Sequence, residues 1–419
     1  MKSILKPLNQ SGVAILMAIT TVAIIAFLAV ELAYDTASEY LISAQEIQRL
    51  KARYAAKAGV EISLLRIHIY RQAMEQLGSQ LGEQKALLDK VWTTPFFWPL
   101  VLPQEASRID QEQMQEILKD SFMDASFQAT IESESSKIDL TDLVSPSKGL
   151  AKIAKQNLIR MIENKKNNDE EWLDTHRDLN AEEIVNNIID WQDKDSVSLN
   201  GGDESSNYSS RNADVQLPPN QPFKTIDELH MVTGMTDSLY DFLSPQVTLY
   251  GAKGVQVNHA SENILMSLDS TISPDIAKAI REKIQGPDGP FNDKQQFFSF
   301  LQSQGITSQG IEDSGVPLLF DVEYNFKIRS HGQYGRSSSD IIAIVYDFDK
   351  VKERLVDALI NEQTQNSSAG AQQGQGDTTA QEGQQGSTAS GGTANNDNSK
   401  PPEEKKKNSK PQVVYWFEI

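Results

Sequence analysis

The stretch VAILMAITTVAIIAFLAV, residues 13–30, decides the architecture of the chain. It contains no charged residue and no Gly, and residues 8–12 before it are also uncharged. Together they reach the roughly 20 residues that a helix needs to cross a bilayer. Lys2 and Lys6 precede the run, and acidic residues follow it. Because cationic flanks stay in the cytoplasm, we expect a single span with the rest of the chain outside the inner membrane.

A secretory signal peptide has a similar charged start and apolar core. Two features oppose that interpretation: no small-x-small cleavage site follows the run, and the helical pattern continues beyond Val30. From residue 31 to about 92, apolar residues recur at steps of mostly three and four, which predicts one long helix with a single apolar stripe. Two separate helices are the alternative, with a break near Gly59, Gly78 or Gly82, because Gly weakens a helix interior by roughly 1 kcal/mol.

The composition is that of an acidic protein large enough for two domains. The 419 residues include 39 basic and 58 acidic side chains, giving a formal charge of -19. This balance argues against a nucleic-acid surface and fits partners with basic patches or divalent cations. The absence of Cys is compatible with an oxidising periplasm but does not require one.

Patterns typical of strands flank a long helical region. Residues 126–140, SFQATIESESSKIDL, alternate apolar and polar side chains and turn at Ser135-Ser136, which predicts a hairpin. Residues 149–311 have helical patterns joined by polar connections, and alternating patterns then return. The expected later strands are 318–330, 340–348 and VVYWFEI at 413–419.

This order predicts one α/β domain with a helical domain inserted in it. The α/β domain comprises residues 93–148 and 312–419, and the insertion comprises residues 149–311. Within the α/β domain, residues 366–399 contain no apolar residue except Ala and are rich in Gln, Gly, Ser, Thr and Asn. Because such a segment cannot bury enough surface to offset its ordering entropy, we expect residues 366–410 to be a disordered loop before the last strand.

The densest functional candidate is IIDWQDKDSVSLNGGDESSNYSSRNAD, residues 188–214. It crowds carboxylates around Gly201-Gly202 on a loop that follows a helix. Ca²⁺ takes about 6–8 hard oxygen ligands with tolerant geometry, and repulsion among so many carboxylates would otherwise disfavour an ordered loop. The spacing is not that of an EF-hand, so the residues alone leave a metal site and a solvated acidic loop as alternatives.

Residues 217–251 and 255–301 form a degenerate internal repeat, in which PFKTIDEL is echoed by PFNDKQQF. Each half predicts a helix, a short turn and a second helix, and the pattern resembles helix-hairpin-helix modules. DNA-binding versions use a Gly-x-Gly hairpin, whereas the hairpins here are 233–236 and 269–273, and the second has no Gly and begins with Asp269. We therefore expect a packing module for protein partners and no nucleic-acid binding.

No catalytic set is visible in the sequence. The five His residues show neither an HExxH motif nor a triad-like context, and there is no Gly-x-Ser-x-Gly elbow. We therefore expect a protein that is not an enzyme.

A basic, polar leader that ends in Gly12 and precedes an apolar helix resembles the leader of type IV pilins and pseudopilins. The resemblance implies cleavage by a prepilin peptidase between Gly12 and Val13, retention of the helix, and methylation. Most pilins carry Glu at the fifth mature position, where this chain has Met17. Absence of that Glu is typical of general secretion pathway protein K of type II secretion systems. An unpaired carboxylate is costly inside a membrane, and a subunit without one suits the tip of a filament.

The acidic loop is similar to the protein K pattern DWxDxDsxxxxxGGaEDxxY. The matching residues are Asp190, Trp191, Asp193, Asp195, Gly201, Gly202, Glu204 and Tyr208. The resemblance implies calcium in this loop. A Glu-Asp pair is usual where this chain has Asp203-Glu204, which leaves open which carboxylate coordinates. The candidate ligands are Asp193, Asp195, Asp203, Glu204, Asn212 and Asp214.

The order of leader, hairpin, acidic loop, helical repeat and terminal strand is also that of protein K. The resemblance implies an α+β fold: a pilin-type long N-terminal helix and an α/β pseudopilin head with an inserted all-α domain of helix-hairpin-helix or SAM-like type. The corresponding segments are a leader (1–12), a transmembrane part of the helix (13–34), a periplasmic part (35–92) and the two domains given above.

The implied function is that of a minor pseudopilin that caps the periplasmic pseudopilus of a Gram-negative type II secretion system and takes part in export of folded proteins. Its implied partners are other minor pseudopilins, the inner membrane, prepilin peptidase, the secretin and secreted substrates. Two alternatives remain: a membrane-anchored periplasmic helix-hairpin-helix nucleic-acid receptor, and a minor pilin of a type IV pilus.

Overall fold

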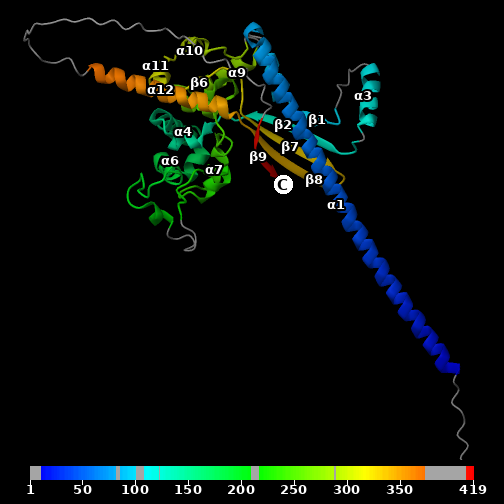
Figure 1. The fold of residues 1–419 in the computed structure, drawn as a ribbon. Coiled ribbons are helices and arrows are strands. Elements are labelled where there is room, and N and C mark those ends of the chain that lie inside the picture. The colour runs from blue at the N-terminus through cyan, green and yellow to red at the C-terminus, as the bar shows by residue number, and fades with distance from the viewer. Residues whose placement is uncertain are drawn as a thin grey trace, which may run out of the picture.

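The computed structural model describes residues 11–81, 85–100, 108–121, 123–208, 217–286, 289–372 and 412–419. It combines a very long helix, a five-stranded antiparallel sheet and a group of shorter helices beside the sheet (Figure 1). This arrangement confirms the predicted α+β class.

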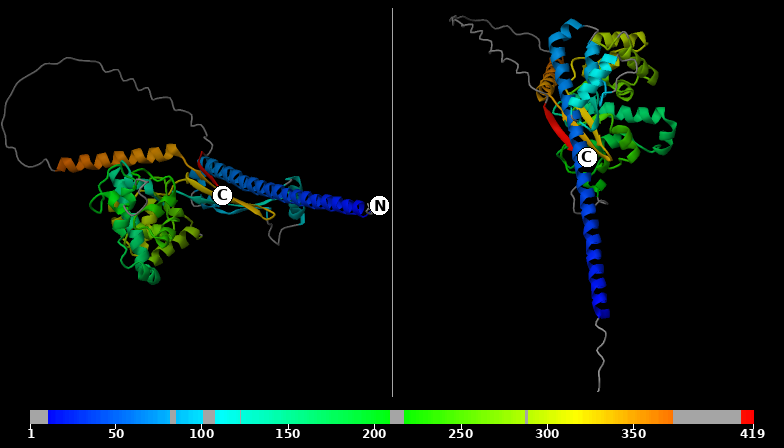
Figure 2. Two further views of the ribbon diagram at one scale, coloured as in Figure 1. Left: turned by 90° about the horizontal axis from the view of Figure 1, so that it is seen from below. Right: turned by 90° about the vertical axis from the view of Figure 1, so that its right-hand side faces the viewer.

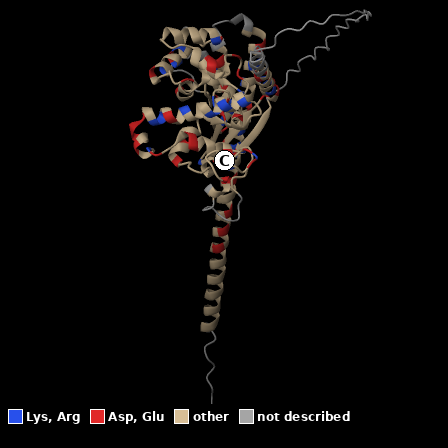
Figure 3. Ribbon diagram, turned by 90° about the vertical axis from the view of Figure 1, so that its left-hand side faces the viewer, with Lys and Arg blue, Asp and Glu red and all other residues tan. Residues whose placement is uncertain are grey.

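The long helix α1 spans Ser11–Leu81, 71 residues, and at 1.5 Å per residue it is about 105 Å long. Figure 2 shows it extending far beyond the rest of the molecule, and Figure 3 shows its outer part without charged residues. This outer part contains the one segment, among the described residues, that is long and apolar enough to cross a membrane. Its polar side chains bond within the helix, since the hydroxyl of Thr21 donates to the carbonyl of Met17 at 2.8 Å. The helix therefore exposes an almost wholly apolar surface.

The first helix ends at Leu81, so the prediction of one helix to residue 92 is wrong beyond that point. A second helix, α2 (Lys85–Thr93), follows and packs back against α1. Of the three glycines considered as breaks, Gly59 and Gly78 lie inside α1. Gly59 is needed for close packing, because a Cβ there would lie 2.2 Å from the hydroxyl oxygen of Ser330.

Burial of one aromatic side chain explains why α2 folds back. Trp92 is 2% exposed and packs edge-on against Tyr70 of α1 and Phe326 of the sheet, with ring centroids 6.0 and 5.2 Å away. The Nε of Arg66 donates to the carbonyl of Val91 at 2.7 Å and holds the end of α2 in place. A helix continued through residue 92 would carry Trp92 away from this core.

The main sheet has the strand order β1-β2-β7-β8-β9, and all neighbouring strands are antiparallel. The strands are β1 (Phe96–Trp98), β2 (Ser126–Ser133), β7 (Phe326–Tyr334), β8 (Ser337–Val345) and β9 (Val413–Glu418). Helix α3 (Arg108–Asp120) lies between β1 and β2 in the chain.

Helix α1 crosses one face of this sheet, and side chains between the helix and the sheet form a hydrophobic core. Val60, Ile67 and Tyr70 of α1 join one buried cluster with Ile328 of β7 and Ala343 of β8. Close approach requires a glycine on β7, because a Cβ on Gly332 would lie 2.2 Å from the carbonyl oxygen of Ala52.

The predicted hairpin at residues 126–140 is wrong. β2 pairs with β1 and β7, whereas β3 (Ile138–Asp139) pairs in parallel with β4 (Val247–Thr248) in a separate small sheet. The turn between β2 and β3 is held by the buried carboxylate of Glu323, which accepts hydrogen bonds from the hydroxyls of Ser133 and Ser135. The serines therefore direct the chain out of the main sheet.

The last strand returns to the main sheet. β9 pairs with β8, with Trp416 opposite Ala343 and Glu418 opposite Ile341. Helix α12 (Phe348–Gln372) continues into the segment expected to be disordered, so that expectation is wrong for residues 366–372. The remainder of that prediction, residues 373–410, lies outside the described residues.

The inserted region is a helical domain packed around one hydrophobic core, which includes Leu158, Ile188, Leu239, Leu265 and Ile280. A small parallel pair, β5 (Val255–Gln256) and β6 (Leu318–Leu319), joins its middle to its end. The helices are η2 (Leu140–Val144), α4 (Lys148–Asn168), α5 (Glu170–Thr175), α6 (Ala181–Asp190), η3 (Glu204–Tyr208), η4 (Ile226–Met231), α7 (Asp237–Leu243), η5 (Val257–His259), α8 (Glu262–Leu268), α9 (Pro274–Gln285), α10 (Lys294–Ser303) and α11 (Gln309–Ser314).

A buried ionic cluster ties the entrance of this domain to its middle. The Nζ of Lys253 lies 2.9 Å from Asp139 Oδ2 and 2.7 Å from Asp142 Oδ1, and it donates to the hydroxyl of Thr141 at 3.0 Å. Burial alone would lower the pKa of Lys253, but the two carboxylate charges outweigh burial and raise it. The ammonium group therefore stays charged and neutralises the carboxylates around it.

Candidate metal centre

The site begins at the last residue of α6. Asn180 starts this helix by accepting hydrogen bonds from the backbone N–H groups of Glu182 and Glu183, as its capping sequence predicts. The helix ends at Asp190, which is 3% exposed. The carboxylate of Asp190 accepts hydrogen bonds from the hydroxyl of Ser198 at 2.8 Å and from the backbone N–H of Leu199 at 3.1 Å. Asp190 therefore fixes the acidic loop to the end of α6.

Two glycines turn the loop back towards the helix. Gly201 and Gly202 have φ values of +93° and +91°, a conformation that L side chains rarely adopt. Around this turn the N–H of Ser198 donates to the carbonyl of Gly202 at 3.1 Å, and Val197 and Asp203 form an antiparallel bridge. The turn therefore places Glu204, the residue after Asp203, near the end of α6.

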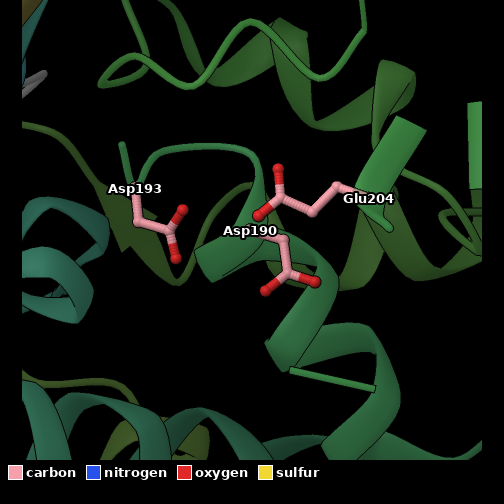
Figure 4. A group of neighbouring side chains, drawn as sticks. All are labelled: Asp190, Asp193 and Glu204. Carbon is pink, nitrogen blue, oxygen red and sulfur yellow. The ribbon is translucent and has the colours of Figure 1, made fainter. Parts of the chain in front are cut away.

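Three carboxylates converge at this place. One oxygen atom from each of Asp190, Asp193 and Glu204 lies within 4.8 Å of the others (Figure 4). Asp193 Oδ1 and both carboxylate oxygens of Glu204 are buried and have no hydrogen-bond partner within the described residues. A hard cation would satisfy these oxygens.

The raised pKa values of two of these carboxyl groups show that the protein alone does not compensate their negative charges. Burial raises the pKa of Glu204 to about 7, with further contributions from the charges of Asp193 and Asp190. Burial and the neighbouring charges of Asp195 and Asp190 raise the pKa of Asp193 to about 6. Both carboxyl groups therefore resist ionisation unless a cation joins them.

The structure brings together two of the six predicted ligands, Asp193 and Glu204. Asp203 is exposed and accepts hydrogen bonds from the N–H and hydroxyl of Ser205 at 2.8 and 2.6 Å, which lower its pKa. Asp195 Oδ1 accepts a hydrogen bond from the N–H of Val197 at 2.9 Å. Both side chains shape turns of the loop.

Asn212 and Asp214 lie outside the described residues. Asp190 was not among the predicted ligands, although its position directly before Trp191, in the family-like Asp-Trp pair, is the sequence signal that could have identified it.

Aromatic side chains at both ends of the acidic loop pack against the helical domain. Trp191 is buried and stacks on Phe223, with ring centroids 5.9 Å apart and planes 8° apart, and it also contacts Tyr208 at 6.0 Å. The hydroxyl of Tyr208 accepts a hydrogen bond from the N–H of Thr233 at 3.2 Å. Both ends of the loop are therefore anchored in the core of the helical domain.

The first predicted hairpin, 233–236, is enclosed by α6. The carbonyl of Thr233 accepts a hydrogen bond from the Nδ2 of Asn187 at 2.9 Å, and a Cβ on Gly234 would lie 2.6 Å from the side chain of Ile184. In the second hairpin, Asp269 accepts a hydrogen bond from the N–H of Thr271 at 2.9 Å. The first hairpin thus packs against protein, and the second presents an acid where a phosphate site needs free N–H groups.

The two echoed sequences share a hydrogen bond at the start of a helix. The carboxylate of Glu228 accepts a hydrogen bond from the N–H of Lys224 at 2.9 Å, and the side-chain carbonyl of Gln296 accepts one from the N–H of Asn292 at 2.7 Å. The echo between the two sequences therefore corresponds to a shared local structure.

The processing positions lie at the far end of α1. Gly12 and Val13 are in its first turn, and the carbonyl of Met17 accepts hydrogen bonds from Thr20 and Thr21 within the helix. The rest of the predicted leader, residues 1–10, lies outside the described residues. Cleavage after Gly12 stays a prediction.

A long apolar N-terminal helix packed along an antiparallel sheet, with a helical domain inserted between strands, is an α+β architecture consistent with the one expected of a pseudopilin. Residues 136–252 match the family model "Type II secretion system (T2SS), protein K". This segment contains the acidic loop up to Tyr208 and the first half of the repeat. This segment is therefore similar to protein K, as the resemblance in the sequence predicted.

The fold is similar to a chain in the crystal structure of the GspK-GspI-GspJ complex from the enterotoxigenic Escherichia coli Type 2 Secretion System. The match has a TM-score of 0.50 at 19% sequence identity and covers 74% of this chain and 95% of the other. No curated protein matches the chain.

Proposed function

We propose that this chain is a minor pseudopilin of a type II secretion system, of the protein K type, and that it caps the tip of the periplasmic pseudopilus during export of folded proteins. The match to the protein K model over residues 136–252 carries this proposal. The pseudopilin-like fold and the absence of a membrane carboxylate at Met17 support it. Its role is structural and not enzymatic.

The outer part of α1 anchors the subunit in the inner membrane as a single span, with the head in the periplasm. Prepilin peptidase cleaves between Gly12 and Val13, and the new terminus is methylated. Beyond the apolar run, α1 still exposes large apolar side chains before it reaches the sheet. They are Tyr34, Tyr40, Leu41, Ile42, Ile47 and Leu50. This surface suits lateral packing against the helices of other minor pseudopilins, which requires no intramembrane carboxylate.

The size and place of the inserted domain support a position at the tip. It lies beside the sheet at the end of the molecule that is remote from the membrane part of α1 (Figure 2). A domain of this size is hard to accommodate inside a helical shaft, so the subunit is the first of the filament. From there its acidic head meets the secretin or secreted substrates.

We further propose that Asp190, Asp193 and Glu204 hold a structural Ca²⁺ ion. Their unpartnered buried oxygens and raised pKa values support a hard cation at this place. A bound cation would offset the repulsion among the carboxylates. The chain's own part is to hold Asp193 and Glu204 close to Asp190 through the Gly201-Gly202 turn.

Filament position tests the proposed function. In cells that assemble pseudopili with an epitope-tagged copy of this chain, we expect gold-labelled antibody at one end of each filament. Labels spread along the shaft would contradict the tip position. The variant Met17→Glu is the matched comparison, because it restores a carboxylate at the fifth mature position but keeps the bulky inserted domain, so the label should remain at the end of the filament.

A further inference from the structure

A cavity of about 310 Å³ lies where the sheet, α2 and the inserted domain meet. It shares no residue with the metal centre. The end of β2 and the turn after it contribute Glu132, Ser133, Ser136 and Lys137. Helix α2 contributes Trp92, and the inserted domain contributes His259, Ile264 and Arg281. Its size is at the lower end of the range of small-ligand sites, about 300–1,000 Å³.

One positively charged residue in the cavity wall, Arg281, has no ion-pair partner within the described residues. Lys137 Nζ lies 2.6 Å from Glu134 and 3.6 Å from Glu132, and Glu132 also lies 3.5 Å from the Nε of Arg329. These two acids form the ion pairs of Lys137 and Arg329, and their charges also act on the half-buried Lys327 of β7. Arg281 forms no ion pair within the described residues and donates one hydrogen bond, to the carbonyl of Ala260 at 3.3 Å.

The positive charge of Arg281 affects the pKa of the neighbouring His259. Burial and, to a smaller extent, the positive charge of Arg281 lower the pKa of His259 to about 4. The imidazole is therefore neutral at pH 7, although its Nε2 lies 3.8 Å from the Asp89 carboxylate on the wall behind it. At neutral pH Arg281 is therefore the charged group that the described residues of the inserted domain contribute to the cavity wall.

The remaining walls combine apolar and hydroxyl groups. Trp92 is almost fully buried beside the cavity, Ile264 and Pro245 add aliphatic surface, and Ser136 and Ser261 add hydroxyls. A planar guanidinium next to an apolar wall suits a carboxylate on a short peptide segment, because Arg binds carboxylates through two parallel N–H groups. We propose that this cavity binds a carboxylate of a partner polypeptide, with Arg281 as its ionic contact.

Calorimetric titration of the full chain in detergent with three capped dipeptides tests this proposal. Ac-Leu-Glu-NH₂ carries a side-chain carboxylate, Ac-Leu-Gly-OH carries a main-chain carboxylate, and Ac-Leu-Gln-NH₂ is the neutral control. We expect at least one acidic peptide to bind about tenfold or more tightly than the neutral one. Which acidic peptide binds better distinguishes an acidic side chain from a chain terminus. Equal affinity for all three, or no binding at 10 mM (roughly the weakest affinity of interest), would overturn the proposal.

Two variants locate the binding. Arg281→Gln should weaken the acidic peptide by about tenfold or more, whereas Arg336→Gln, with the same charge change at an exposed turn of the sheet, should leave affinity unchanged. Thr93→Trp fills the cavity rim from an exposed position and should also abolish binding, without altering a charge. Undiminished binding by a folded Thr93→Trp variant would place the peptide elsewhere and refute the assignment.

Discussion

Two carboxylate clusters in this molecule each need a cation to offset the repulsion among their negative charges, but the source of the cation differs. At the entrance of the helical domain, Asp139 and Asp142 surround the ammonium group of Lys253 at 2.9 and 2.7 Å. At the end of α6, Asp190, Asp193 and Glu204 converge within 4.8 Å, and three of their oxygens have no hydrogen-bond partner within the described residues. The first cluster carries its own cation, and the second has the geometry for one supplied from outside.

The difference teaches which part of the domain can respond to its surroundings. A cluster neutralised by a covalently attached lysine is fixed once the chain folds. A cluster that takes its cation from solution is complete only when the ion is present, so the order of its loop depends on ion concentration. The following predictions test this contrast, from the largest expected effect to the smallest.

Removing the internal cation should have the largest effect. Lys253→Met leaves Asp139 and Asp142 without their counter-ion in a buried place and should lower the free energy of unfolding by about 3–5 kcal/mol. Denaturant titration monitored by circular dichroism measures this loss. Lys350→Met, which removes a more exposed pair with Glu353, should cost about 1 kcal/mol or less. Similar losses for both variants would contradict the contrast.

Calcium should stabilise the second cluster by an intermediate amount. At a concentration 100 times its dissociation constant, a bound ion adds about 2.7 kcal/mol to the free energy of unfolding. Glu204→Gln should remove this gain, and it should raise stability in chelator because it removes one of the repelling charges. Differential scanning calorimetry with calcium or with chelator measures both changes. A calcium-dependent gain that survives Glu204→Gln would exclude this residue as a ligand.

In the presence of chelator, the repulsion among the same carboxylates should also make the stability of the chain depend on pH, with a smaller effect. The pKa values of Asp193 and Glu204 are raised to about 6 and 7, so the folded chain binds more protons than the unfolded chain between about pH 4 and 7. Stability should therefore fall as pH rises through this window. Buried Glu323 and half-buried Asp89, whose pKa values are also raised, add to the same slope.

The comparison that isolates the metal centre is between the wild type and the double variant Asp193→Asn, Glu204→Gln, whose slope in chelator should be shallower. Calcium should flatten the wild-type profile and leave the double variant unchanged. Identical profiles for the two proteins in chelator would show that other carboxyl groups cause the whole slope.

The smallest effect is expected at Asp203. Asp203→Ala removes its hydrogen bonds to Ser205 and should lower the melting temperature only slightly, because both bonds lie within one exposed turn. The calcium-dependent gain in melting temperature should be unchanged, because the Asp203 side chain bonds within its own turn. Loss of that gain would return Asp203 to the set of ligands predicted from the sequence.

The sequence was sufficient for features that depend on local patterns. The uncharged run at 13–30 predicted an exposed apolar helix, and alternation predicted the two strands that form the β7–β8 hairpin, although their bounds shift to 326–334 and 337–345. The capping sequence at Asn180 predicted the start of α6. In each case neighbouring residues alone determine the structure.

Features that depend on distant contacts were missed. Glu323 lies far along the chain from Ser133 and Ser135, so local alternation could not show that the turn after β2 leads out of the sheet. In the same way, only the folded loop shows that Asp190 joins Glu204 while Asp203 does not. Spacing identified the right loop, but side-chain direction within it required the three-dimensional structure.

The position of β9 has a practical consequence for labelling this protein. The strand that completes the sheet is separated from α12 by 39 residues of sequence, 373–411, and each doubling of the length of a connection between two elements costs only about 0.6 kcal/mol. A fluorescent protein or affinity tag inserted between Gln372 and Gln412 should therefore leave the head intact. The same tag fused after Ile419 would sit directly beside an edge strand whose Trp416 and Phe417 are partly exposed.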